Sequence, residues 1–113
     1  MAKRQKSLFG EFLVKEIKNA GMSQEAFYNA VGITKPYFYD LLNAAPPTPE
    51  IQQRMIDVLD SNTCVDTFRA RRLFDLAAQG RNEIPADIRS SIMNHPSAWN
   101  QIRELLDSVL KEK

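Results

Sequence analysis

The side chains that most often do catalytic work are scarce in this sequence. It has one cysteine, Cys64, and one histidine, His95, and no group of side chains with metal-ligand spacing. It also lacks a glycine-rich phosphate loop and a nucleophile with a base nearby in the sequence. We therefore expect no enzyme, no metal site and no cofactor. Cys64 is interpreted as a small buried hydrophobe and His95 as a helix-end residue.

A second group of side chains has the chemistry to bind a partner. It lies in SQEAFYNAVGITKPYFYDLLN, residues 23–43, where two short runs with helical spacing meet at Gly32. Phe38 and Leu41, three residues apart, are expected to face inward. The side chains then left outward are Lys35, Tyr37, Tyr39 and Asp40. Two helices joined by a glycine turn are a common packing unit, but an outward N-terminal turn braced by a crossing helix is also how a helix-turn-helix enters a major groove.

Helical spacing of apolar residues continues along the whole chain, without the alternation of strands and without a repeat. Helices are expected over residues 8–20, 23–31, 34–43, 48–62, 63–80 and 85–94, and from residue 97 onward. Ser23 and Thr34 are the expected N-caps of the second and third helices. We expect Asn62 and Thr63 to cap the fifth, with Val65 and Phe68 on its inner side. The segment AAPPTPE, residues 44–50, is expected to be a stiff surface connection.

The totals describe one ordinary domain. The chain has 113 residues, 43% of them hydrophobic, and a net charge of +1. No apolar run approaches the ~20 residues that a membrane span needs, and the single cysteine fits a reducing cytoplasm. We therefore expect a cytoplasmic, all-α protein that does not bind a membrane.

Basic side chains gather in two places, which matters because weak overall charge leaves nucleic-acid binding to local patches. The first is an N-terminal arm over residues 1–7 that contains Lys3, Arg4 and Lys6. The second consists of Arg69, Arg71 and Arg72. We interpret the second cluster as a solvated helix face paired with Asp66 or Asp75.

Residues 8–60 resemble the Cro and lambda-repressor-like helix-turn-helix family, often called the XRE family. The matching features are Ser23-Gln24-Glu25, the apolar Phe27 and Val31, Gly32 at the turn, Ile33 after it, and Phe38 and Leu41 in the next helix. The later stretch RRLFDLAAQGRNEIPADIRSSIM resembles the tails of small phage and mobile-element regulators. The resemblance implies a lambda-repressor-like helix-turn-helix domain over residues 8–62, with additional C-terminal helices over residues 63–113 packed with it as one compact unit.

The resemblance also implies roles for individual residues on double-stranded DNA. Base edges would be faced by recognition-helix residues Thr34, Lys35, Pro36, Tyr37, Tyr39 and Asp40. Phosphates would be contacted by Gln24, Asn43, Lys3, Arg4 and Lys6. In such a groove Lys35 could donate to guanine O6 or N7, Asp40 could accept from cytosine N4, and Tyr37 could pack on a thymine methyl group. The family usually has a small residue where this chain has Tyr28, so that ring must push the two helices apart or turn along the groove between them.

The last expected helix carries an apolar stripe. Trp99, Ile102, Leu106 and Val109 are spaced by three, four and three residues, and Leu105 and Leu110 widen the stripe. One interpretation is that the stripe covers the core of its own domain. The other, which we adopt, is a homodimer interface, because this family usually doubles its contacts through a two-fold dimer on paired half-sites.

Together these observations favour a sequence-specific DNA-binding transcriptional regulator, of the phage or mobile-element repressor type, that acts as a dimer. The alternative is a helix-turn-helix scaffold used to bind another protein, as in an antitoxin or an inhibitor. Exposed tyrosines fit this alternative too, because tyrosine is enriched at protein interfaces.

Overall fold

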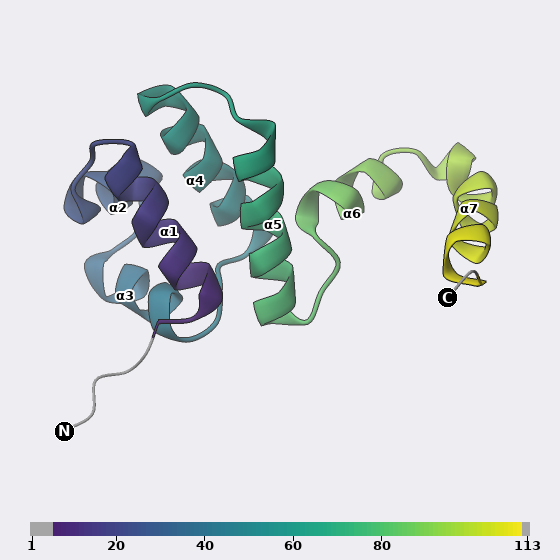
Figure 1. The fold of residues 1–113 in the computed structure, drawn as a ribbon, viewed down its shortest axis with the longest axis horizontal. Coiled ribbons are helices and arrows are strands. Elements are labelled where there is room, and N and C mark those ends of the chain that lie inside the picture. The colour runs from purple at the N-terminus through teal and green to yellow at the C-terminus, as the bar shows by residue number, and fades with distance from the viewer. Residues whose placement is uncertain (1–5, 112–113) are drawn as a thin grey trace.

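The computed structural model describes residues 6–111, and these form helices without any strand (Figure 1). The order of helices expected from the sequence is confirmed. The elements are α1 (Leu8–Asn19), α2 (Gln24–Val31), α3 (Lys35–Asn43), α4 (Pro49–Asn62), α5 (Thr67–Arg81), α6 (Ala86–Met93), the 3₁₀ turn η1 (Pro96–Ala98) and α7 (Trp99–Lys111). Within the described range no helix is long and apolar enough to cross a membrane.

Side-chain hydrogen bonds cap the N-termini of α1, α2 and α3. The hydroxyl of Ser23 accepts from the Ala26 N–H, and that of Thr34 accepts from the Tyr37 N–H. Both predicted caps are confirmed, and Ser7 caps α1 in the same way by accepting from the Gly10 N–H.

The predicted cap of the fifth helix is wrong. Asp66 is the N-cap of α5, and its carboxylate accepts from the Arg69 N–H. Asn62 and Thr63 instead donate from their side chains to the carbonyls of Val58 and Leu59, in the last turn of α4. These side chains satisfy carbonyls that the end of a helix leaves without a backbone donor, so they end one helix rather than begin the next.

All of α1–α5 contribute to one hydrophobic core. α5 lies against α1 and α4, so the core extends beyond residue 62 into the C-terminal half of the chain. Burying a large apolar side chain in this core contributes about 1.5–3 kcal/mol relative to leaving it in water. The largest fully buried side chains are Phe9, Leu13, Ile17, Phe27, Phe38, Leu41, Leu42, Pro47, Met55, Leu59 and Leu73.

A close approach between α1 and the end of α3 fixes where α3 lies. The backbone N–H of Ser7 donates to the Leu42 carbonyl over 2.9 Å, and the Ser7 hydroxyl donates to the same oxygen over 3.3 Å. One turn further along α1, a Cβ atom on Gly10 would lie 2.1 Å from that oxygen. Only glycine therefore allows the two helices to come this close.

The proline-rich connection between α3 and α4 is more buried than the predicted surface segment. Pro46 and Pro47 are buried. Gln52 donates from its side-chain amide to the Pro47 carbonyl over 2.8 Å, and Arg81 donates to the Pro46 carbonyl over 3.3 Å. The connection is thus held on one side by α4 and on the other by the end of α5.

Three side chains near the start of α5 differ from their predicted placement. Cys64 is exposed, and Val65 and Phe68 are 80% and 81% exposed, so the prediction that they are buried is wrong. The reason is helical phase. Because α5 begins only at Thr67, Val65 precedes the helix, and Phe68 lies about 140° around the helix from Leu73, which is buried.

Arg69 also departs from the predicted solvated face. Its guanidinium donates to the Asp60 carboxylate over 2.6 Å, to the Thr63 hydroxyl over 3.0 Å and to the Cys64 carbonyl over 2.7 Å. Only 9% of its side chain is exposed. Arg69 therefore joins the end of α4 to the start of α5, whereas Arg71 and Arg72 are exposed.

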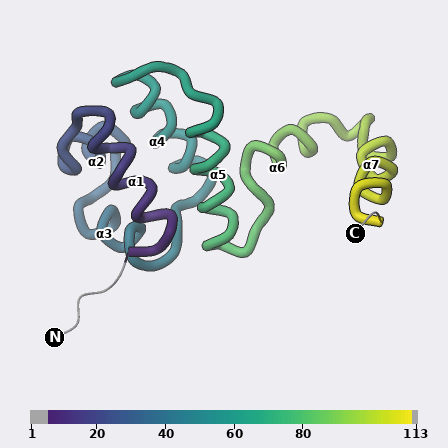
Figure 2. Tube along the Cα trace, viewed as in Figure 1, coloured from purple at the N-terminus to yellow at the C-terminus, as the bar shows by residue number. Residues whose placement is uncertain are grey.

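The C-terminal helices do not all join the compact unit that the sequence led us to expect. α5 is part of the core and α6 contacts α5, with Ala86 at its start partly buried, but no residue of α6 or α7 is fully buried. Figure 2 shows the trace leaving α5 as an arm that ends in α7, at the opposite end of the molecule from α2 and α3. The radius of gyration is accordingly 16.2 Å, against about 13 Å for a compact chain of this length.

Candidate nucleic-acid interface

α2 and α3 are joined by a three-residue turn that is held by local hydrogen bonds. Gly32 ends α2 in the left-handed conformation, with φ 90° and ψ 30°. The N–H groups of Gly32 and Ile33 both donate to the Tyr28 carbonyl, over 3.0 and 3.1 Å. The nearest atom to a Cβ on Gly32 would be 3.8 Å away, so the backbone angle and not crowding calls for glycine here.

Phe38 anchors α3 in the core, as predicted. It is fully buried, and its ring centroid lies 6.2 Å from that of Phe27 and 5.4 Å from that of Tyr28. Tyr28 is itself 9% exposed, so its ring fills space between α2 and α3. The bulky residue at this position is therefore accommodated by aromatic packing with Phe38, at an interplanar angle of 42°.

The side of α3 opposite Phe38, Leu41 and Leu42 is exposed. Tyr37 and Tyr39 are 38% and 40% exposed, and the ring of Tyr39 also rests edge-on against Phe38 at 5.6 Å. At 100° per residue, Pro36 and Asp40 lie at the centre of this face, with Tyr37 on one flank and Lys35 and Tyr39 on the other. The outward direction predicted for Lys35, Tyr37, Tyr39 and Asp40 is confirmed, and Thr34 and Pro36 are exposed with them.

Cationic side chains stand at both ends of α3. Lys35 is exposed in its first turn, and Lys6 is exposed next to Ser7, which is hydrogen-bonded to Leu42 near the other end. A nine-residue helix is about 13 Å long, so the two ends are separated by roughly that distance. Lys3 and Arg4, predicted to contact phosphates with Lys6, lie outside the described residues.

Gln24 and Asn43, the two helix residues predicted to contact phosphates, are less exposed than the side chains on the outer face of α3. Gln24 is half-buried in the first turn of α2. Asn43 is half-buried at the end of α3, and its side-chain amide donates to the Tyr39 carbonyl over 2.9 Å. An amide nitrogen carries two hydrogens, so Asn43 keeps one donor and its oxygen for a partner.

The residues predicted for a dimer interface are not near α3. Trp99, Ile102, Leu106 and Val109 share one side of α7, at the far end of the arm. Sequence reasoning missed the apolar residues of the preceding segment, Ile84, Ile88 and Met93, which are also exposed. The spacing of Ile84, Ile88 and Ile92, four residues apart, was a signal that could have identified this second apolar face.

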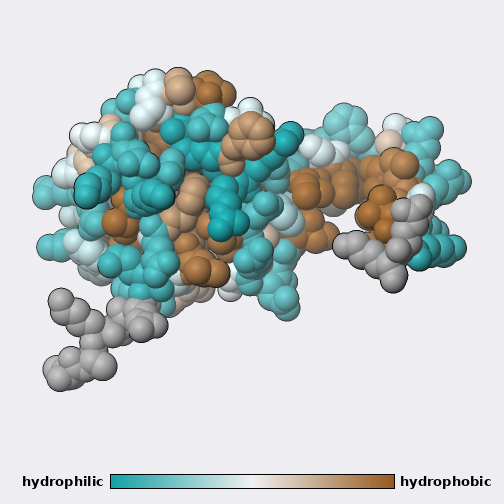
Figure 3. Space-filling model, in the orientation of Figure 1, coloured by the Kyte–Doolittle hydropathy of each residue, from teal (hydrophilic) through white to brown (hydrophobic). Residues whose placement is uncertain are grey.

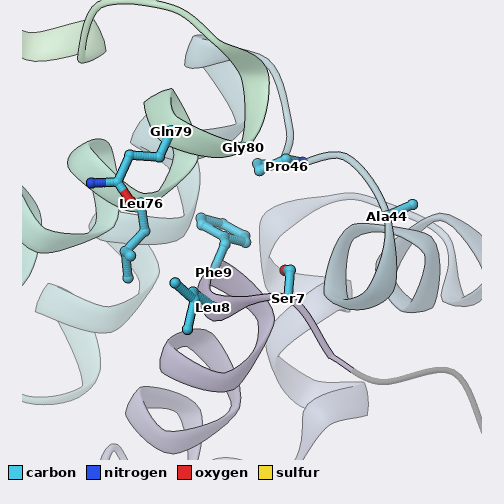
Figure 4. Close-up of a pocket in the computed structure, with 8 residues that line it drawn as sticks. All are labelled: Ser7, Leu8, Phe9, Ala44, Pro46, Leu76, Gln79 and Gly80. Atoms are coloured by element: carbon cyan, nitrogen blue, oxygen red, sulfur yellow. The ribbon is translucent and has the colours of Figure 1, made fainter.

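One hollow among the described residues has a lining without charged side chains. A hollow of about 230 Å³ lies where α1, the proline-rich connection and α5 meet (Figure 4), and it is lined by Ser7, Leu8, Phe9, Ala44, Pro46, Leu76, Gln79 and Gly80. None of these side chains is charged. Among the described residues no three His, Cys, Asp or Glu side chains gather in a way that could hold a metal ion.

One carboxyl group has a clearly perturbed pKa. The Arg81 guanidinium hydrogen-bonds to Glu83 and holds the pKa of that carboxyl below its usual value. Arg81 is the last residue of α5 and Glu83 follows it, and both side chains are partly exposed, so this is a local ion pair at a helix end.

Comparisons of this chain with models of protein families, with curated proteins and with solved structures give no match.

Proposed function

We propose that this protein is a sequence-specific DNA-binding regulator that inserts α3 into the major groove. The observation that carries the proposal is the exposed first half of α3, capped by Thr34 and braced from behind by α2 through Phe38 and Tyr28. An α-helix held in this way fits a major groove about 12 Å wide. The resemblance of residues 8–60 to the XRE family supports the same class of protein.

Each side chain of the exposed face has a role in this proposal. Lys35 donates to guanine, Asp40 accepts from cytosine N4, and Tyr37 packs on a thymine methyl group. Thr34, Pro36 and Tyr39 complete the contact with the bases. Phosphates are contacted by the N-terminal arm, through Lys3, Arg4 and Lys6, and by the side-chain amides of Gln24 and Asn43.

A single short helix reads few base pairs, which is why the proposal includes a dimer. Two copies related by a two-fold axis would place two α3 helices on half-sites about one helical turn apart. We propose that the dimer acts as a repressor of the phage or mobile-element type, as the resemblance of the C-terminal stretch suggests.

Selection from a pool of random duplexes tests the proposal. The purified chain should enrich one motif with two-fold symmetry, and its affinity should fall as salt rises, by a log–log slope of about −0.9 for each phosphate contacted. Arg72, an exposed cation on α5, provides the control. The Arg72→Ala variant should select the same motif as the unmodified chain, whereas Lys35→Ala should not. Failure to enrich any motif would contradict the proposal.

Binding to another protein through the same face is the second candidate. The observation that favours it is charge, because Asp40 offsets Lys35 on α3 while two tyrosines lie beside them. Such a contact would depend little on salt. A chain that enriches no duplex, but loses a protein partner when Tyr37 is replaced by alanine, would favour this candidate.

A further inference from the structure

The arm that follows α5, residues 82–111 with α6, η1 and α7, carries most of the large apolar side chains that are exposed among the described residues. On α7 every apolar residue falls within an arc of roughly 140°, and every charged or polar residue falls on the remainder. In Figure 3 the brown side chains gather along α6 and on the side of α7 turned toward it, while teal covers the outer side. The large apolar side chains left exposed on the arm are Ile84, Ile88, Met93, Trp99, Leu105, Leu106, Val109 and Leu110.

The bend between α6 and α7 is held by hydrogen bonds. The indole N–H of Trp99 donates to the Ile92 carbonyl over 2.6 Å. The backbone N–H of His95 donates to the same carbonyl over 3.2 Å, and the ring of His95 lies 2.7 Å from the Ser91 carbonyl. These contacts satisfy carbonyls at the end of α6. They set the direction of α7. In this position the apolar side of α7 does not contact the core of its own chain.

Two hollows follow the apolar side of the arm and adjoin at Ile92. One, of about 350 Å³, is lined by Glu83, Ile84, Arg89, Ile92 and Met93. The other, of about 210 Å³, is lined by Ile92, Trp99, Ile102, Arg103 and Leu106. They make a groove with an apolar floor, open to solvent, that continues from α6 onto α7.

We propose that this groove receives α7 of a second copy of the chain, so that two arms clasp each other. Most of the groove's lining is apolar, apart from Glu83, Arg89 and Arg103, so a helix that is apolar along one side would fit it, and α7 is such a helix. Exchange about a two-fold axis fills both grooves and covers both α7 stripes at once, which leaves no groove open for further copies. The dimer interface then includes Met93 of α6 and Ile84, which precedes α6, in addition to the stripe on α7.

The available area is sufficient for a stable dimer. Eight large apolar side chains, each about half exposed, amount to roughly 800 Å², which is what each partner buries in an interface of standard size. Leaving this surface in water would be unusual, because contiguous exposed apolar patches larger than a few hundred Å² are rare on monomeric proteins.

Analytical ultracentrifugation of the full chain without DNA is the first test. The unmodified protein should sediment as a dimer. Leu106→Glu on α7 and Met93→Glu on α6 should each raise the dimer dissociation constant by about a hundredfold or more, because each dimer buries the new charge twice. Neither residue belongs to the core, so each variant should keep the far-ultraviolet circular dichroism spectrum of the parent, and its urea midpoint should fall only by the stabilisation that dimerisation gives the parent. Ser108→Glu, on the polar side of α7, is the matched control and should change the constant by less than about threefold.

Crosslinking between copies tests the clasp itself. In a Cys64→Ser background, one tagged variant carries Met93→Cys and a second, untagged variant carries Val109→Cys. After mixing, a bismaleimide should join the two variants, because each has a single cysteine. Glu104→Cys, on the outer side of α7, replaces Val109→Cys in the control pair and should give little product.

Three results would overturn the inference. The first is a monomeric parent protein, and the second is a dimer without the crosslink between residues 93 and 109. The third would come from a chain that carries both Met93→Cys and Val109→Cys, if the crosslink forms only within that chain and never between two chains. The last would mean that α7 folds back on its own α6. The inference extends the dimer of the proposed function, but the two can fail separately. A monomer that still selects a DNA motif refutes the clasp alone, and a clasped dimer that selects none refutes the DNA-binding proposal alone.

Discussion

Replacing Gly10 by alanine tests how α1 sets the position of α3. The added Cβ would lie 2.1 Å from the Leu42 carbonyl oxygen and 2.8 Å from both the Leu42 carbonyl carbon and its Cα. All three are backbone atoms, so no side-chain rotation relieves the clash. α1 and α3 must separate by at least about 1.3 Å to restore ordinary van der Waals contact. That movement also weakens the two hydrogen bonds from Ser7 to the same oxygen.

The expected cost follows from three terms. Forcing extra volume into a packed contact costs about 1–3 kcal/mol, and weakening two hydrogen bonds adds about 1 kcal/mol. Removing a glycine from a helix returns about 1 kcal/mol. The Gly10→Ala variant should therefore be about 2 kcal/mol less stable, which corresponds to a melting temperature roughly 10 °C lower.

Urea unfolding followed by far-ultraviolet circular dichroism measures this change. The midpoint for Gly10→Ala should fall by about 1–2 M urea with an unchanged slope. Lys15→Ala, at an exposed position of the same helix, is the control and should stay within about 0.5 kcal/mol of the parent. If Gly10→Ala equals or exceeds the parent in stability, helix propensity alone governs this position and α1 does not approach α3 as described.

Three further substitutions test the elements around α3 and α5 by the same urea assay. Tyr28→Ala should cost about 3 kcal/mol or more, because it leaves a cavity beside Phe38; an unchanged midpoint would place Tyr28 outside the crossing of α2 and α3. Gly32→Ala should cost about 1–2 kcal/mol through its left-handed backbone alone, and a neutral effect would argue against the turn geometry. Arg69→Ala should cost about 2 kcal/mol because it removes charged hydrogen bonds that join α4 to α5, whereas Arg72→Ala should be nearly neutral; equal effects would contradict the buried role of Arg69.

Features that depend on neighbouring residues could be predicted from the sequence. The helices follow from apolar spacing, and the caps at Ser23 and Thr34 follow from side chains that reach N–H groups three residues away. The inward direction of Phe38 and the outward direction of Tyr37 and Tyr39 follow from the same spacing. Local geometry therefore determined most of the candidate interface, while its contact with DNA stays a prediction.

Features that depend on the start of a helix or on distant partners could not be predicted. Taking Thr63 instead of Asp66 as the cap of α5 shifted the expected inner side, and Phe68 was placed in the core although it is 81% exposed. The ion pair between Arg69 and Asp60 joins residues in two different helices. The spacing on α7 indicated that one side of this helix packs against another surface. The sequence alone could not show whether the core of the same chain covers that side, and the structure shows that it does not.

The measurement that tests the central claim most directly is the affinity of the parent chain and of Lys35→Ala for a selected duplex and for its single-base-pair variants. If Lys35 reads a base, its removal should cost about 1–3 kcal/mol on the selected duplex and abolish discrimination at one base pair only. Arg72→Ala should leave both the affinity and the discrimination pattern unchanged. An equal loss for Lys35→Ala on every duplex, or no loss on any, would contradict the insertion of α3 into the major groove.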